Sequence, residues 1–232
     1  MSQELLSIVI PALEEGENIG RCLAALDSAL GGLPREVLVC LDPRDRTTRS
    51  ALAAGPIAAR LVESAGPGFG RALSAGFSAA SGDVVVVVMA DLSDDPALIP
   101  KMAEKIRRGG AAVVSGSRVL AGGGREGGPI LPRILARLAG ASLKALAGLP
   151  TEDPTNNFRA YSADFLRMVT VETRTGFAVG LELTVKAHLL GLPVAEVPAT
   201  WRERESGRSK ARLLRDLPGY LRWYFKALFR FR

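Results

Sequence analysis

Residues 83–96 read DVVVVVMADLSDDP, and this stretch limits the folds open to the chain more than any other. Five consecutive valines favour a strand. A strand with no polar alternation must be covered on both faces, as in a parallel sheet flanked by helices. Three carboxylates, Asp91, Asp94 and Asp95, follow the valines. We therefore predict a buried strand over 83–91 that delivers acidic side chains to the edge of a sheet.

The first half of the chain alternates apolar strand patterns with segments of helical spacing. We expect strands at 5–12, 36–42, 57–64, 83–91 and 111–118, and helices at 17–30, 70–82 and 96–110. This alternation is typical of an α/β fold with a parallel sheet covered by helices. In such sheets the ligand lies beyond the carboxyl ends of the strands. Asp42, Asp91 and Arg118 all lie at predicted strand ends, so we expect them to converge.

The second half is less regular. We expect a mobile glycine-rich loop at 121–129, helices at 130–148 and 176–191, a turn, short strand and helix within 153–169, and a strand leading into a basic loop over 192–210. Neither a repeat nor a domain linker is visible. We therefore expect one large domain over 1–210, followed by a basic, amphipathic helical segment over 211–232.

Charge and cysteine usage restrict the function classes. The net charge is +6, and residues 202–232 contain ten Lys or Arg against three acids. A basic end of this kind implies an anionic partner, namely phosphate, nucleic acid or an acidic membrane. Nucleic acid is disfavoured because basic and aromatic residues interleave only in the tail. Cys22 and Cys40 lack metal spacing and fit reduced, buried thiols.

Membrane and targeting signals are weak. The first residues show neither a basic n-region nor a cleavable apolar segment. No apolar run approaches the roughly 20 residues that span a bilayer. The expectation is a protein that is neither secreted nor integral to the membrane.

The tail over 218–232, PGYLRWYFKALFRFR, has the pattern of an amphipathic helix that begins at Pro218. Its expected apolar face comprises Tyr220, Leu221, Tyr224, Phe225, Leu228 and Phe229. Arg222, Lys226 and Arg230 form a basic stripe beside that face. Contact with an anionic membrane surface is one interpretation. A helix packed on the domain, with its Arg stems snorkelling, is the other.

The acids after the valine run have separate expected tasks. Asp94 or Asp95 suits a helix N-cap before Pro96. Asp91, at the strand tip, suits a divalent metal that in turn holds a diphosphate. Hard oxygen ligands favour Mg²⁺ or Mn²⁺.

Several motifs follow one another in a recognisable order. They are SIVIPALEEGENI (7–19), VCLDPRDRTT (39–48), GPGFGRALSAGFSAASGD (66–83), ADLSDDP (90–96), GSR (116–118), NNFRAY (156–161) and RESGRSK (204–210). Together they resemble the family 2 glycosyltransferases of GT-A fold, and specifically the polyprenyl-phosphate (dolichol-phosphate) mannosyl- or glucosyltransferases. The resemblance covers essentially the whole chain. Each motif alone is weak, but their ordered succession is specific.

The chain departs from the pattern of this family at several positions. Met89 stands where the family has the first Asp of a D-A-D motif, and Ser93 stands where relatives can carry another metal ligand. Leu13 replaces a frequent Tyr. Pro43 and Arg44 replace small polar residues. With Asp91 as the single remaining acid of the motif, metal affinity without nucleotide should be poor.

The resemblance implies roles for individual residues. A nucleotide site is implied at Pro11, Leu13, Glu15, Asp42, Arg71, Ala90 and Asp91, with Asp91 also the metal ligand. An acceptor-phosphate site is implied at Arg118, Arg133, Arg204 and Lys210, and catalytic roles fall to Asp91 and Arg118. Such cations neutralise the leaving diphosphate and hold a phosphate acceptor. That acceptor is already ionised and needs little help from a base, which fits a chain whose single histidine, His188, we expect to be structural.

The resemblance therefore implies an inverting transfer of mannose or glucose from GDP-mannose or UDP-glucose to a polyprenyl or dolichyl phosphate, with Mg²⁺ or Mn²⁺. The enzyme would be peripheral on the cytoplasmic face of the membrane and could have a membrane-anchored partner subunit. One alternative is a sugar-hydroxyl acceptor, with Asp153 or Glu182 as base. Another is a non-catalytic homologue that binds nucleotide or scaffolds a membrane.

Overall fold

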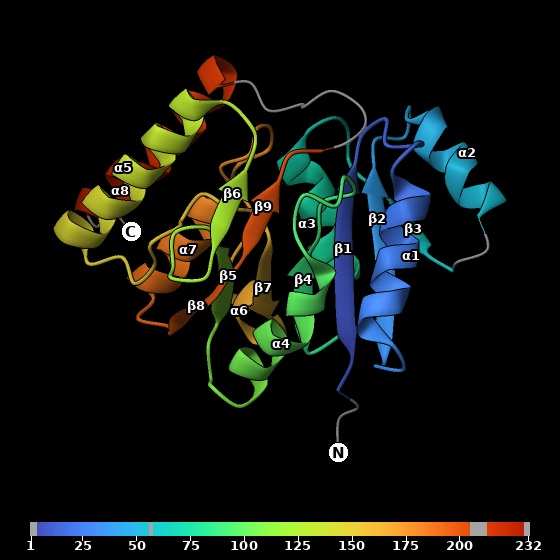
Figure 1. Ribbon diagram of the computed structural model, residues 1–232, viewed down its shortest axis with the longest axis horizontal. Coiled ribbons are helices and arrows are strands. Elements are labelled where there is room, and N and C mark those ends of the chain that lie inside the picture. The colour runs from blue at the N-terminus through green and yellow to red at the C-terminus, as the bar shows by residue number, and fades with distance from the viewer. Residues whose placement is uncertain (1–3, 56–57, 205–212, 230–232) are drawn as a thin grey trace.

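The computed structural model describes residues 4–55, 58–204 and 213–229. A seven-stranded sheet in the order β3-β2-β1-β4-β7-β5-β8 forms its centre, with helices on both faces (Figure 1). The strands of this sheet are β1 (Leu6–Ala12), β2 (Arg35–Leu41), β3 (Arg60–Glu63), β4 (Val84–Val87), β5 (Val113–Ser117), β7 (Arg159–Ser162) and β8 (Val194–Pro198). The predicted α/β class with a mostly parallel sheet is confirmed.

One strand runs against the others. β7 is antiparallel to both β4 and β5, between which it lies. The remaining pairs of this sheet are parallel. Because β7 reverses direction, its N-terminal end, with the 153–158 segment before it, lies at the same edge as the carboxyl ends of β4 and β5.

The helices follow the predicted order closely. They are α1 (Ile19–Leu30), α2 (Arg46–Ala54), α3 (Phe69–Ala79), the 3₁₀ turn η1 (Pro96–Leu98) with α4 (Ile99–Arg107), α5 (Ile130–Ala147), α6 (Ala163–Met168), α7 (Val179–Leu189) and α8 (Leu213–Phe229). α2 was not expected. Asp45 caps it by accepting a hydrogen bond from the Thr48 N–H at 3.0 Å.

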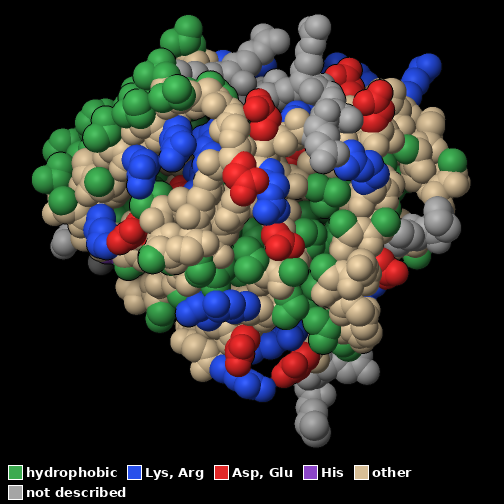
Figure 2. Space-filling view, in the orientation of Figure 1, with side chains coloured by type: hydrophobic (Ala, Val, Ile, Leu, Met, Phe, Trp, Pro, Cys, Tyr) green, Lys and Arg blue, Asp and Glu red, His purple; other side chains and the backbone are tan. Residues whose placement is uncertain are grey.

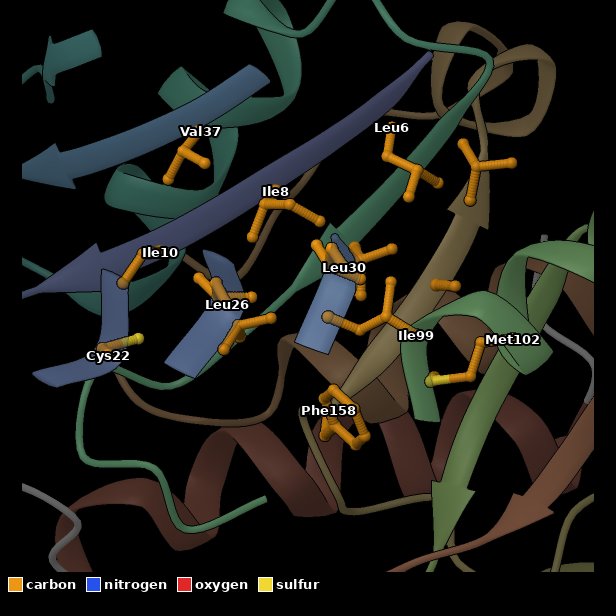
Figure 3. Close-up of a cluster of buried hydrophobic side chains, with 14 of the residues drawn as sticks. Leu6, Ile8, Ile10, Cys22, Leu26, Leu30, Val37, Ile99, Met102 and Phe158 are labelled. Atoms are coloured by element: carbon orange, nitrogen blue, oxygen red, sulfur yellow. The ribbon is translucent and has the colours of Figure 1, made fainter. Parts of the chain in front are cut away.

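The valine run is buried on both faces, as predicted. Val84, Val86 and Val88 point into one core, and Val85 and Val87 point into the other. The first core lies between the sheet and helices α1 and α4, and Figure 3 shows its side chains from β1, α1 and α4 gathered in one cluster, with Phe158 at its margin. However, β4 ends at Val87. The predicted strand over 83–91 is therefore too long, and Asp91 lies in the loop after β4.

The glycine-rich segment is more ordered than a loop. It contains β6 (Gly124–Glu126), which pairs in parallel with β9 (Thr200–Arg202) in a separate two-stranded ribbon. The Arg202 N–H donates to the Ser93 carbonyl at 2.7 Å. This bond ties the ribbon to the loop that carries Asp91.

The C-terminal helix begins earlier than predicted, because α8 starts at Leu213 and contains Pro218 in its interior. α8 lies beside α5 in Figure 1 and packs on both α5 and α7. Trp223 and Ala227 are fully buried in this cluster, and Tyr220, Tyr224 and Leu228 are half-buried against it. The predicted single apolar face is therefore divided between an inner and an outer side. None of the described helices combines the length and apolarity needed to cross a bilayer.

We predict that Gly70→Ala destabilises the protein by at least about 3 kcal/mol, since overpacking of this kind costs about 1–3 kcal/mol and a backbone clash costs more. A β carbon at Gly70 would lie 1.6 Å from the Thr173 carbonyl oxygen, so α3 would have to move away from the 170–175 segment. The matched control is Gly20→Ala. Gly20 is likewise the second residue of its helix, and a β carbon added there would have nothing within 4 Å. Urea unfolding should show a loss for the first variant and a neutral or small stabilising effect for the second. Equal effects would contradict the close contact.

Candidate active site

Two carboxylates from different strand-end loops meet on one guanidinium. Glu15 follows β1, and Asp91 follows β4. The Arg204 Nη2 contacts Asp91 Oδ2 and lies 3.4 Å from Glu15 Oε1. The side chains of Arg204, Glu15 and Asp91 are only 14%, 8% and 9% exposed. Because removal of one partner from a buried pair costs about 3–5 kcal/mol, this acid–Arg204 cluster holds the two loops together.

The loops that present these acids contain unusual backbone. Glu14 and Leu92, each adjacent to one of the acids, have φ angles of 54° and 56°. This left-handed conformation is rare for residues with a β carbon and costs about 1–2 kcal/mol. The Glu14 N–H donates to Asp45 Oδ2 at 2.8 Å, and the Ser93 N–H donates to Asp91 Oδ1 at 3.1 Å. The hydrogen bonds hold both acids in place against this cost.

A second ion pair lies at the end of β5. Arg118 donates through Nε to Asp153 Oδ2 at 2.6 Å and through Nη2 to Asp153 Oδ1 at 2.8 Å. The same Nη2 also reaches the Thr155 hydroxyl at 3.0 Å. Burial would raise the pKa of Asp153, but the Arg118 charge and hydrogen bonds lower it to about 2. Asp153 is therefore a firmly ionised partner of Arg118.

Asp94 and Asp95 have different roles, and one of the two caps the helix that begins at Pro96, as predicted. Asp95 caps η1 by accepting a hydrogen bond from the Ala97 N–H at 2.9 Å, which confirms the N-cap prediction for this residue. Asp94 is buried instead, 3.4 Å from the Asn156 side-chain amide. Burial raises the pKa of Asp94 to about 7 against the opposing Arg118 and Asn156, and Asp91 and Asp153 raise it further. Asp94 is thus a proton-holding group between the two ion pairs.

The predicted nucleotide residues lie around the carboxyl edge of β1, β2 and β4. Pro11 is inside β1, Leu13 is exposed in the loop after it, and Ala90 is buried one residue before Asp91. Asp42 directly follows β2 and accepts hydrogen bonds from Arg44 through Nε and Nη2, both at 2.9 Å. These bonds to Arg44 lower the pKa of Asp42 to about 2.

The predicted cations are not all in one place. Arg204 binds the acids rather than facing an open site, and Arg71 on α3 donates to the Pro67 carbonyl at 3.0 Å. Arg133 is exposed on the first turns of α5. Lys210 lies outside the described residues.

Sequence reasoning missed two arginines. Arg159, the first residue of β7, is fully buried and donates to the Asn156 and Asp153 carbonyls and to the Thr184 hydroxyl. Arg125 of β6 lies 4.2 Å above the Trp201 ring. The signal for Arg159 was its place in NNFRAY, and the signal for Arg125 was a lone cation among glycines.

Asp153 and Glu182, the two carboxylates considered as bases, already form ion pairs within the fold. Asp153 is held by Arg118. Glu182 on α7 is fully buried and accepts hydrogen bonds from the Glu172 and Thr173 N–H groups at 2.6 and 2.8 Å, and it pairs with Lys186. The single histidine, His188, makes a hydrogen bond to the Ala147 carbonyl at 3.0 Å, in line with a structural role.

The carboxylate oxygens of the acid–Arg204 cluster are chemically suited to bind a divalent cation. Glu15 and Asp91 present hard carboxylate oxygens that already face a positive group. Across the described parts of the chain, no three acidic, histidine or cysteine side chains gather as a complete metal cage. Any cation held here would therefore need further oxygen ligands from a bound molecule.

Comparison with known proteins places the chain in a family. The family described as "Glycosyl transferase family 2" matches residues 7–169. A dolichol-phosphate mannosyltransferase of Pyrococcus furiosus is 32% identical over 88% of this chain, which spans 58% of that protein. A dolichyl-phosphate hexose transferase of Haloferax volcanii is 31% identical, covering 88% of this chain and 86% of that one. The chain thus spans little more than half the length of the first relative and most of the second.

A solved structure agrees at the level of the fold. Glucosyl-3-phosphoglycerate synthase from Mycobacterium tuberculosis, crystallised with Mn²⁺, UDP and glucosyl-3-phosphoglycerate, superposes with a TM-score of 0.72. It covers 98% of this chain and 79% of that one at 24% sequence identity. The likeness supports the predicted GT-A architecture.

We predict that Asp94 makes the stability of the protein fall as pH rises. Its folded pKa of about 7 lies above the unfolded value near 3.9. The folded state therefore holds a proton that the unfolded chain releases, and the stabilisation is lost between about pH 4 and 7. Asp94→Asn should gain about 2–3 kcal/mol relative to wild type between pH 5 and pH 8, as measured by urea unfolding.

Asp95→Asn is the control for this measurement, since the same change is made at the exposed neighbouring carboxylate. The free energy of unfolding of this variant should follow the wild-type pH profile, lowered at every pH by the weakened helix cap. Parallel profiles for wild type and Asp94→Asn would show that Asp94 does not hold the proton.

Proposed function

The chain belongs to glycosyl transferase family 2, and from this premise we propose that it transfers a hexose from a nucleotide sugar to a polyprenyl phosphate. The observation that carries the proposal is the meeting of Glu15, Asp91 and Arg204 at the carboxyl edge of the sheet, which also holds the Arg118–Asp153 pair. The charges of both groups act on Asp94. Acids that can hold a cation and arginines that can hold a phosphate are the two components such a transfer needs. The two archaeal relatives, whose names specify dolichol phosphates, support the acceptor class.

The donor half of the site would lie over β1, β2 and β4. In this proposal Glu15 and Asp42 contact the nucleoside, with Pro11, Leu13, Arg71 and Ala90 around it. Asp91 would hold Mg²⁺ or Mn²⁺, and that ion when bound neutralises charge on the leaving diphosphate. The donor would be GDP-mannose or UDP-glucose.

The acceptor half would lie toward β5, β6 and α5. Arg118, Arg133 and Lys210 would hold the acceptor phosphate, and Arg204 would join them when the donor cation replaces it on the acids. One phosphate oxygen attacks the anomeric carbon as the bond from that carbon to the diphosphate breaks, so the configuration inverts. The attacking oxygen is already ionised. The proposal therefore needs no base, in keeping with the engagement of both Asp153 and Glu182.

The outer sides of α5 and α8 support a position at a membrane. Figure 2 shows hydrophobic side chains gathered along the edge of the molecule over α5. The exposed apolar residues of the two helices are Ile130, Leu131, Ile134, Leu135, Leu138, Leu146, Leu214, Leu217, Leu221, Phe225 and Phe229. Arg133 and Arg137 are exposed on α5 among them. We propose that this α5–α8 surface rests on the cytoplasmic face of an anionic membrane, with residues 1–210 as the transferase domain and 211–232 as its anchoring segment.

The predicted basic stripe of the tail contributes less to this surface than expected. Arg222 contacts Glu172, and the Lys226 ammonium lies 3.5 Å from the same carboxylate. Lys226 also lies 4.5 Å from the centre of the buried Trp223 ring. Arg222 and Lys226 contact Glu172 and lie over Trp223, which agrees with the interpretation of a helix packed on the domain, while the apolar stripe faces outward.

The proposed transfer is tested with a panel of nucleotide sugars, short polyprenyl phosphates, and magnesium or manganese, the product being identified by mass spectrometry. We expect Asp91→Asn to lower the transfer rate at least about 100-fold, the usual effect of removing a charge-stabilising group. Asp95→Asn, the same chemical change at an exposed cap, should stay within a fewfold of wild type. Thermal unfolding of both variants controls for folding. Near-normal turnover by Asp91→Asn would refute its assigned role.

We predict that a double variant, Leu138→Asp with Phe225→Asp, binds anionic vesicles at least about 10-fold more weakly than wild type, because burial of each apolar side chain is worth about 1.5–3 kcal/mol. Nucleotide affinity should not change. Met168→Asp, an equally exposed apolar residue on α6, is the control and should bind vesicles normally. Vesicle sedimentation at low and physiological salt measures the effect. Unaltered sedimentation of the double variant would exclude the α5–α8 surface as the contact.

A further inference from the structure

Arg125 is held in a defined place by the two-stranded ribbon. Arg125 and Trp201 are directly paired in the register of β6 and β9, and the guanidinium carbon lies 4.2 Å from the Trp201 ring centre. On another side the group packs on Gly128, where a β carbon would come within 2.8 Å of Nη2. The guanidinium is therefore oriented before any ligand arrives, which lowers the entropy lost on binding.

The hydrogen-bonding of Arg125 is incomplete. Its Nε is buried and has no acceptor among the described residues. A buried donor without a partner costs about 1–3 kcal/mol. Two acids, Asp153 and Glu203, act on Arg125 by their charges, and both have other partners. Asp153 binds Arg118, and Glu203 Oε2 accepts a hydrogen bond from the Gly128 N–H at 3.0 Å. Among the described residues this donor therefore stays unsatisfied.

The charge around Arg125 is positive. Burial lowers the pKa of Arg125, and the charges of Arg118 and Arg133 lower it further, while Asp153 and Glu203 oppose them without reversing the effect. Arg125 on β6 thus lies within electrostatic reach of two other guanidiniums, those of Arg118, which follows β5, and Arg133 on α5. An anion bound beside Arg125 would relieve this repulsion and accept hydrogen bonds from the guanidinium.

We propose that Arg125 binds the phosphate monoester of the acceptor through its guanidinium, together with Arg118 and Arg133. This inference deepens the proposed function and rests on it for the acceptor. The ligand chemistry is a phosphate monoester, whether on a lipid or in solution. A planar guanidinium fork suits such a group better than an ammonium does.

The ribbon also places this anion site next to the donor acids. Trp201, which supports Arg125, lies three residues before Arg204 in the chain, and Arg202 between them bonds to the Ser93 carbonyl. Arg125 and the acid–Arg204 cluster are therefore joined by one short segment. A phosphate at Arg125 would lie close to the acids that we propose hold the donor.

The test measures anion binding and transfer separately on the full chain. Wild type, Arg125→Ala and Arg125→Lys are titrated with inorganic phosphate, a short polyprenyl phosphate and the matching neutral polyprenol. Calorimetry and thermal shift measure the binding. The control is Arg108→Ala. It removes the same charge from an 83%-exposed side chain at the end of α4, on the opposite edge of the sheet.

We expect Arg125→Ala to lower the affinity for both phosphate ligands about 10- to 100-fold, because hydrogen bonds to charged groups are worth about 1.5–3 kcal/mol. Arg125→Lys should recover only part of this loss, and Arg108→Ala should keep wild-type affinity. The KM for acceptor should rise in the Arg125 variants while the KM for nucleotide sugar stays constant. Neutral polyprenol should bind all variants alike. Binding of inorganic phosphate but not of the lipid would assign the site to a soluble phosphate monoester.

Unchanged phosphate affinity in both Arg125 variants, with wild-type unfolding temperatures, would overturn the inference. If Arg125→Ala does not fold, the Arg125→Lys titration decides, because full affinity there would exclude a role for the planar guanidinium. Failure of the proposed function has a different signature. The wild type would then transfer no sugar to any polyprenyl phosphate, while the phosphate titrations would still separate Arg125→Ala from Arg108→Ala.

Discussion

A sheet buried on both faces can place its polar chemistry only at its ends, and this constraint organises the molecule. The valines of β4 alternate between two cores, and β1 does the same. A polar side chain on these strands enters a covered layer and needs a partner there, as Ser7 of β1 has in Glu36, because an unsatisfied group costs several kcal/mol. Glu15, Asp42, Asp91 and Arg118 therefore all lie in segments that follow the carboxyl ends of the strands.

Charge neutrality is the next requirement at that edge. Carboxylates gathered from several loops repel one another unless a cation lies between them. Arg204 supplies this cation for Glu15 and Asp91, and Arg118 supplies it for Asp153. Where no such partner is available, as for Asp94, the group keeps its proton at a higher pH instead. In the proposed reaction the donor cation would compete with Arg204 for the same oxygens, which couples the donor acids to the ribbon that carries Arg125.

Much of the first half was predictable because its signals are local. The strand–helix alternation, the burial of the valine run, and the positions of Asp42 and Arg118 at strand ends were all read correctly from apolar periodicity. The errors came where pairing partners are distant in sequence. β6 reads as a glycine-rich loop until β9 pairs with it, and β7 cannot be recognised as antiparallel until its neighbours β4 and β5 are known. Arg125 was missed because its role depends on that ribbon.

By itself the sequence determined the α/β class, the two-sided burial of β4 and the set of acids and arginines available for chemistry, since composition and periodicity are properties of contiguous residues. Tertiary structure alone decided which of these groups meet. Glu15 and Arg204 are separated by 189 positions, and no local pattern indicates their contact. It also decided that Trp223 turns inward while Phe225 stays exposed, because only the packing of α8 on α5 and α7 chooses between the faces of an amphipathic helix.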